Sequence, residues 1–137
     1  MRTQAEAGYI AEIAQQAALD DGQNILVDGS LQSFDWYKKV LQGIKHKYPK
    51  YKIVLLYTDA QRSIIEKRIA DRAAKTGRSV PKKIWEGSFD AIPKSAEALE
   101  PLAHATFVFT NQGGDPQLIY AYPQLRKPFK SAADAIR

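Results

Sequence analysis

Ile53-Val-Leu-Leu-Tyr57 is a continuous apolar run that is followed at once by the polar pair Thr58-Asp59. An unbroken run of this length is typical of a strand that is buried on both faces, as in parallel sheets. Two other segments, Asn24–Asp28 and Thr106–Thr110, have the same character. The sequence therefore predicts three buried strands at 24–28, 53–57 and 106–110.

Apolar residues recur at helical spacing in the stretches before and between these strands, at 3–20, at Tyr37–Tyr48 and at Ile65, Ile69 and Ala73. Gly22, Pro49 and Gly77 stand where these helices should end, with Thr58 or Asp59 as the cap that begins the third. Pro81 is expected to open a further helix, and Pro93-Lys94-Ser95 to interrupt it. Alternating helices and buried strands indicate an α/β fold, with a parallel sheet flanked by helices.

Beyond Pro116 the periodic pattern weakens, and Pro123 and Pro128 favour an irregular C-terminal tail. Residues 113–137 are therefore expected to form a tail beyond the domain. In an open parallel sheet, ligands bind at the carboxyl ends of the strands. Those ends are predicted at Asp28-Gly29-Ser30, Thr58-Asp59 and Thr110-Asn111, which are all polar.

The length and composition of the 137-residue chain exclude several classes of protein and of site. The length suits one domain, and the absence of cysteine excludes disulfides and thiolate metal sites. Two histidines without an acidic cluster give no expectation of a metal site. Apolar runs are far shorter than a membrane span, and the N-terminus has no apolar signal-peptide core. We expect a soluble cytoplasmic protein that does not enter the membrane.

Positive charge is concentrated between Arg62 and Lys83, where eight basic residues face only two acidic ones. This local excess is larger than the net charge of +5 for the whole chain. Arg68, Arg72 and Lys75 share one helical face. Such a segment attracts the phosphates of a small ligand or of nucleic acid. Only Trp85 is close enough to offer stacking, so nucleic acid is the less favoured partner.

Three segments taken in order resemble the zeta toxin family of P-loop kinases. They are Glu6-Ala-Gly-Tyr-Ile-Ala-Glu12, then Ile25–Leu31 with Asp35-Trp-Tyr37, then Thr76-Gly-Arg-Ser-Val-Pro81 with Ile92-Pro-Lys-Ser95. The resemblance covers about residues 3–112. It implies that residues 1–112 are part of a three-layer P-loop kinase domain, whose sheet is continued by elements that would precede Met1. It also implies ATP-dependent phosphorylation of a sugar nucleotide of the UDP-N-acetylglucosamine class.

The sequence departs from this family in one respect that matters for chemistry. No glycine begins the phosphate-binding pattern Gly-x-x-x-x-Gly-Lys-Ser/Thr, and the family's catalytic aspartate upstream of the central helix is also missing. ATP and Mg²⁺ are expected for the complete family domain, whereas the residues present support neither. We therefore expect a fragment, a mis-started reading frame or a degenerate copy. Such a chain should be inactive alone and should self-associate through an exposed sheet edge.

The resemblance also implies roles for individual residues. Asp28 and Ser30 face the substrate, and Glu6 is a further substrate contact. The competing interpretation of Asp28 is an ordinary turn, because Asp-Gly favours turns.

Arg78 is implied to grip the ATP phosphates and to stabilise charge in the transition state, with Arg68 or Arg72 as its catalytic partner. Asn111 is implied to contact adenine. A solvated basic face remains the alternative for the arginines, and a turn-forming role for Asn111. For the chain as a whole, the alternatives are a basic nucleic-acid-binding module and a non-catalytic interaction module.

Overall fold

The computed structural model describes residues 2–123, with side chains from residue 6 onward. The chain divides into two compact units, Met1–Ser30 and Leu31–Arg137. Each unit is considered by itself.

The N-terminal unit consists of one long helix and an extended segment. Helix α1 (Arg2–Asp20) ends just before Gly22, whose φ of 73° lies in the left-handed region that glycine tolerates. The strand predicted at 24–28 is wrong, because these residues form no regular secondary structure and Leu26 is 86% exposed. An apolar run becomes a strand only when a second backbone pairs with it, and no described strand pairs with this run.

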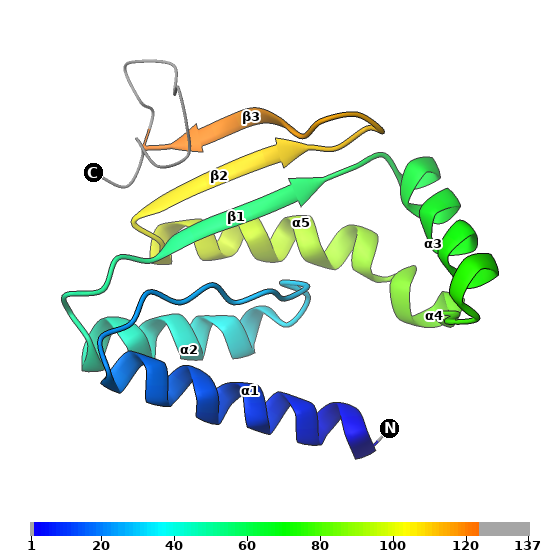
Figure 1. Ribbon diagram of the computed structural model, residues 1–137. Coiled ribbons are helices and arrows are strands. Elements are labelled where there is room, and N and C mark those ends of the chain that lie inside the picture. The colour runs from blue at the N-terminus through cyan, green and yellow to red at the C-terminus, as the bar shows by residue number, and fades with distance from the viewer. Residues whose placement is uncertain (1, 124–137) are drawn as a thin grey trace. The chain divides into compact units, whose positions relative to one another are not determined.

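The C-terminal unit is built on a three-stranded sheet with the order β1-β2-β3 (Figure 1). Strands β1 (Val54–Asp59) and β2 (Ala105–Thr110) are parallel, and β3 (Gln117–Tyr122) is antiparallel to β2. The strands predicted at 53–57 and 106–110 are confirmed with small shifts at their ends. The fold class is α/β as predicted, although the sheet is mixed because β3 reverses direction.

Strand β3 was not expected, since residues beyond Pro116 were predicted to be irregular. Pro116, beyond which the pattern weakens, and Pro123, one of the two prolines that favoured an irregular tail, lie just outside the strand. Proline at the ends of an edge strand removes no hydrogen bond from the ladder. The six residues between them are free to pair with β2, and the residues that connect β2 to β3 form the turn of a hairpin. The remaining residues predicted as tail, 124–137, lie outside the described part of the chain.

Five helical segments connect and cover the strands of this unit. Helix α2 (Phe34–Lys47) ends before Pro49, and α3 (Arg62–Thr76) ends at Gly77 with a φ of 69°. The N-cap residue of α3 is Gln61 rather than Thr58 or Asp59, because β1 continues through Asp59. The others are α4 (Lys82–Trp85), α5 (Ser88–Leu99) and the short 3₁₀ helix η1 (Glu100–Leu102).

The predicted break at Pro93 is wrong, because α5 passes through this proline. Proline removes one backbone hydrogen bond from a helix interior, which opposes this outcome. Pro93 is exposed, whereas Ser95, Ala96 and Leu99 of the same helix are buried. Burial of that face outweighs the lost bond, and the helix remains continuous.

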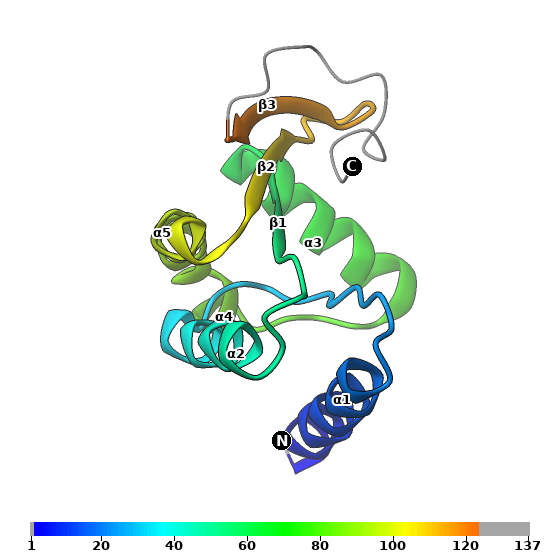
Figure 2. The ribbon, with the colours of Figure 1, turned by 90° about the vertical axis from the view of Figure 1, so that its left-hand side faces the viewer.

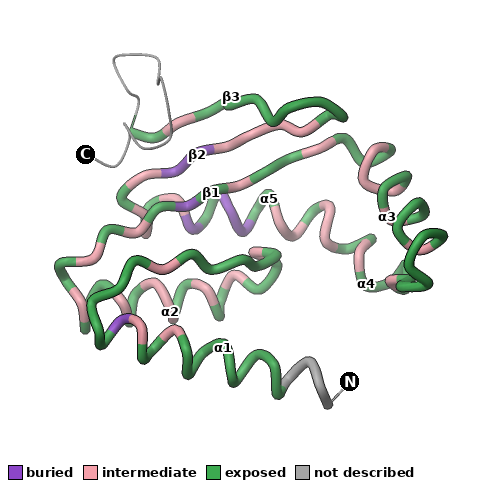
Figure 3. The backbone as a smooth tube through the Cα atoms, in the orientation of Figure 1, coloured by how far each residue is buried: buried purple, intermediate pink, exposed green. Residues whose placement is uncertain are grey.

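The core of the unit lies between the sheet and α5. Figures 1 and 2 both show α5 running alongside β1 and β2, and α2 packs beside α5. Leu99 of α5 is fully buried, and Leu55 and Phe107 are the buried apolar residues of β1 and β2. Figure 3 shows that α3, unlike α5, has no buried residue, since all of its residues are exposed or intermediate. The Arg68–Asn111 hydrogen bond joins α3 to the residue that follows β2.

Candidate functional site

The carboxyl ends of β1 and β2 meet at one edge of the sheet. The parallel register aligns Asp59 with Thr110, and the Asn111 N–H donates to the Asp59 carbonyl at 2.8 Å. This bond extends the ladder one residue beyond β2. We call Asp59, Arg68, Thr110, Asn111 and Gln112 the carboxyl-end cluster. The prediction that Thr58-Asp59 and Thr110-Asn111 lie together is confirmed.

Hydrogen bonds tie the start of α3 to the residues that follow β2. Only two residues separate β1 from α3, so the helix begins at this edge of the sheet. The Arg68 guanidinium donates to the Asn111 side-chain oxygen at 2.8 Å. Nearby, the Gln61 N–H donates to Gln112 Oε1 at 3.0 Å, and Gln112 Nε2 donates to Thr110 Oγ1 at 2.7 Å.

The two carboxylates of α3 are both paired with cations of the same helix. Glu66 accepts from Arg62 at 2.9 Å, and Asp71 pairs with Lys67 at 3.0 Å. Arg62 also reaches Glu86 at 3.3 Å. No carboxylate among the described residues pairs with Arg68 or Arg72. Their positive charge is therefore available to an anion outside the chain, because the carboxylates of α3 are paired with Arg62 and Lys67.

Tyr57 and Asp59 interact at the end of β1. The Tyr57 hydroxyl donates to Asp59 Oδ1 at 3.4 Å. The pKa of Tyr57 is raised to about 12. Burial of the ring is the largest cause, and the charge of Asp59 and its hydrogen bond with the hydroxyl add to it. Tyr57 therefore remains a proton donor at neutral pH and cannot serve as a base.

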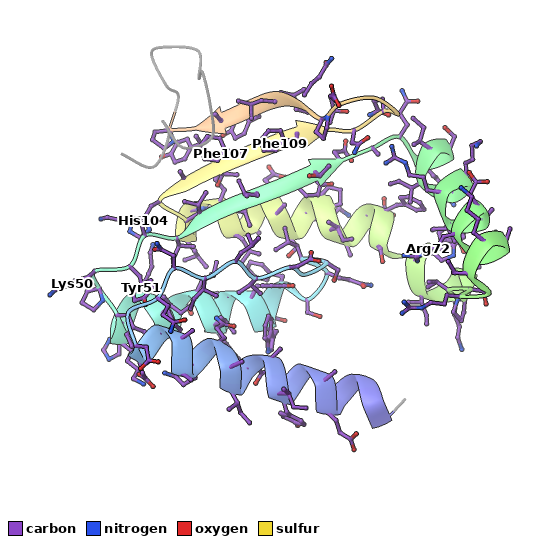
Figure 4. All side chains as sticks on the ribbon, in the orientation of Figure 1. Lys50, Tyr51, Arg72, His104, Phe107 and Phe109 are labelled. Carbon is purple, nitrogen blue, oxygen red and sulfur yellow. The ribbon has the colours of Figure 1, made fainter. Side chains whose placement is uncertain are left out.

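Arg78 and Arg72 occupy different places from Arg68. Arg78 is exposed in the segment after α3, and its N–H donates to Thr76 Oγ1 at 3.3 Å. Along α3 the eight helical steps from Arg68 to Thr76 span about 12 Å. Arg72 is exposed in the middle of this span (Figure 4). Among residues 2–123 no hydrogen bond or ion pair joins Arg78 to Arg68 or Asn111. The predicted convergence of Arg78 with a second arginine stays a prediction.

The three predicted substrate residues belong to the N-terminal unit. Glu6 is exposed on α1, and Asp28 and Ser30 are exposed in the extended segment after it. Their roles also stay predictions. Of the residues implied by the family resemblance, the structure brings together Arg68 and Asn111.

Gln112 is the member of the cluster that sequence reasoning overlooked. Its side chain bridges Gln61 and Thr110, and it lines a depression of about 350 Å³ with Thr110, Gly114, Asp115 and Gln117. A glutamine in a glycine-rich turn carries no sequence signal for this role. Residues 2–123 contain no group of three or more acidic or histidine side chains able to hold a metal ion.

Comparison with known proteins places the chain in a family. The zeta toxin family matches residues 1–121, which extends the resemblance at 3–112 through most of β3. No curated protein and no solved structure matches the chain. None of the described helices has the length and apolar character needed to cross a membrane. The match covers most of the sequence and agrees with the α/β architecture, so the chain belongs to the zeta toxin family and contains a kinase-like domain.

Proposed function

We propose that this chain is the nucleotide-binding part of an ATP-dependent kinase that acts on a sugar nucleotide of the UDP-N-acetylglucosamine class. The observation that supports this proposal most directly is the Arg68–Asn111 bond at the carboxyl ends of two parallel strands. Ligands of open α/β sheets bind at this edge. An arginine held there without a carboxylate partner suits a phosphate group.

The basic residues of α3 and the loop after it would bind the phosphates of ATP. The planar guanidinium of arginine can donate two parallel hydrogen bonds to phosphate oxygens, which a lysine cannot do. Arg78, with Arg68 or Arg72, would oppose the charge that develops in the transition state. Asp28, Ser30 and Glu6 would bind the hydroxyls of the sugar nucleotide.

The residues present fit the phosphates of ATP better than they fit Mg²⁺. The arginines supply donors for anionic oxygens, whereas Mg²⁺ needs carboxylate and phosphate oxygens in octahedral geometry. Among the described residues no three acidic or histidine side chains gather at one place, and we assign no step to a metal held by this chain.

We further propose that the 137 residues alone transfer no phosphate. The sequence has no phosphate-binding loop, and phosphoryl transfer depends on positioning and charge stabilisation that such a loop supplies. Purified chain should give no turnover with ATP and UDP-N-acetylglucosamine. Turnover that Asp28→Asn abolishes would contradict this proposal.

A chimera that carries the N-terminal part of another family member tests the role of the arginines. In that protein Arg78→Ala should lower kcat more than it raises KM, because the lost interaction is strongest in the transition state. The matched control is Lys82→Ala, because Lys82 is an exposed cation nearby that pairs with Glu86 at 3.7 Å. Small, equal effects would mean that the basic segment is a solvated face. Salt-dependent binding of nucleic acid would then be measured as the alternative.

A further inference from the structure

We propose that Asn111 is a positioning residue, which holds the guanidinium of Arg68 at the carboxyl ends of the strands to receive a polyphosphate. This inference rests on the proposed function and deepens it. It assigns the Asn111 side-chain oxygen to Arg68 rather than to adenine. It also selects Arg68 over Arg72 as the arginine that acts at this edge of the sheet.

The backbone of Asn111 is well placed to orient another side chain. Its N–H bonds to the Asp59 carbonyl at 2.8 Å, so the residue continues the parallel ladder of β1 and β2. Asn111 is also half-buried, whereas Arg68 is exposed. The short side chain of Asn111, on a fixed backbone, thus holds the guanidinium of Arg68. Without this bond the long Arg68 side chain would be free to change rotamer. Ordering such a chain before a ligand arrives removes part of the entropy cost of binding.

Arg72 lies one helical turn beyond Arg68 and has no equivalent partner. Among the described residues no hydrogen bond or ion pair involves the Arg72 guanidinium, and the backbone carbonyl of Arg72 accepts from Thr76 Oγ1 at 2.8 Å. Its guanidinium is therefore not oriented by the sheet. The structure thus separates two arginines that helical spacing alone leaves equivalent.

The chemical nature of the partner matters as much as its position. The amide oxygen of Asn111 accepts a hydrogen bond from one of the five guanidinium N–H groups, and the amide group carries no net charge. The charge of Arg68 is therefore not neutralised, and its remaining donors can bind phosphate oxygens. The carboxylates on the same helix, Glu66 and Asp71, are already paired with Arg62 and Lys67. A carboxylate in place of Asn111 would orient the guanidinium equally well and cancel its charge.

The first test measures positioning without any ligand. The Nε–H signal of Arg68, assigned by its loss in Arg68→Lys, is followed by two-dimensional NMR of the full chain. Asn111→Ala should move this signal and speed its exchange with water, because the guanidinium becomes free to rotate. Ser63→Ala is the matched control, because Ser63 is exposed in the first turn of α3 and lies outside the carboxyl-end cluster. An Arg68 signal that is the same in wild type and Asn111→Ala would overturn the proposal.

The second test measures binding of inorganic tripolyphosphate by calorimetry at low salt. Asn111→Ala should weaken binding by about three- to tenfold, the effect expected for one mobile long side chain. Asn111→Asp should weaken it at least as much, although a new ion pair preserves the fold, because the charge of Arg68 is then neutralised. Ser63→Ala should bind nearly as wild type does.

The outcomes of the two tests separate this inference from the proposed function. Unchanged or tighter binding by Asn111→Asp would overturn the inference, even if wild type binds tripolyphosphate. Absence of binding by wild type would overturn the proposed function and the phosphate role of Arg68 together. In that case the NMR test still reports whether Asn111 orients the guanidinium.

Discussion

Acidification should weaken the junction between the beginnings of β1 and β2, because His104 joins them through a hydrogen bond that only its neutral ring can accept. His104 Nδ1 accepts the Ile53 N–H at 2.9 Å, and the His104 N–H donates to the Ile53 carbonyl at 2.7 Å. Figure 4 labels His104 at this end of the sheet. Protonation turns Nδ1 into a donor, so the first of these two bonds is lost.

The direction of the pH effect follows from the surroundings of the ring. Burial lowers the pKa of His104 below its usual 6.5, and the ammonium groups of Lys52 and Lys45 lower it further. The folded chain therefore binds the proton less readily than the unfolded chain does. The contribution of His104 to stability is complete above pH 6.5 and is lost as the pH falls through the lower pKa of the folded state.

The size of the effect is that of one hydrogen bond at a site that water can reach. A net intramolecular hydrogen bond contributes about 0.5–1.5 kcal/mol. His104 is exposed, so water replaces part of the lost interaction and the lower end of this range applies. A loss of about 0.5 kcal/mol corresponds to about 2 °C in melting temperature for a domain of this size.

Thermal unfolding followed by circular dichroism at pH 7.5 and pH 5.0 measures this loss. His104→Asn keeps an acceptor oxygen near the position of Nδ1 but cannot be protonated, so its melting temperature should fall by about 2 °C less than that of wild type. His46→Asn is the control, because His46 is exposed in the last turn of α2 and is the other histidine of the chain. It should not reduce the pH dependence. Equal pH dependence in wild type and His104→Asn would refute the argument.

Other predictions concern burial, backbone conformation and the free sheet edge. Ser95 Oγ is buried without a hydrogen-bond partner, so Ser95→Ala should leave the melting temperature unchanged or raise it, whereas Leu99→Ala should cost about 2–5 kcal/mol. In urea unfolding, Gly77→Ala should destabilise by about 1 kcal/mol because its φ is 69°, while Gly43→Ala, inside α2 with open space around it, should stabilise by a similar amount. Sedimentation should show self-association that Leu56→Lys reduces, because Leu56 is 53% exposed on the edge strand β1; a wild-type monomer at every concentration would contradict this.

The strands show how far local pattern can predict this fold. The runs at 53–57 and 106–110 became β1 and β2 because each found the other as a parallel partner. The run at 24–28 has the same apolar character but has no described partner, and it is extended without being a strand. In β3, pairing with β2 decided the structure against a pattern that favoured an irregular tail. Strand formation is a property of two segments, so a one-dimensional pattern predicts candidates and not pairs.

The helices follow the same logic. Local chemistry alone placed the ends of α1, α2 and α3, because glycine in the left-handed region and proline after a helix act within one turn. The continuation of α5 through Pro93 depended on burial of Ser95, Ala96 and Leu99, which no local rule contains.

The amino-acid sequence by itself determined the α/β class, the concentration of positive charge between Arg62 and Lys83 and the resemblance to the zeta toxin family. These features depend on residue type and on spacing along one element. Only the tertiary structure decided which arginine is held at the carboxyl ends of the strands. Arg68 and Asn111 are 43 positions apart, and they meet because parallel pairing of β1 with β2 brings the start of α3 next to the end of β2. Helical spacing alone makes Arg68 and Arg72 equivalent. The hydrogen bond to Asn111 distinguishes the two arginines, because only Arg68 lies close to Asn111 in space.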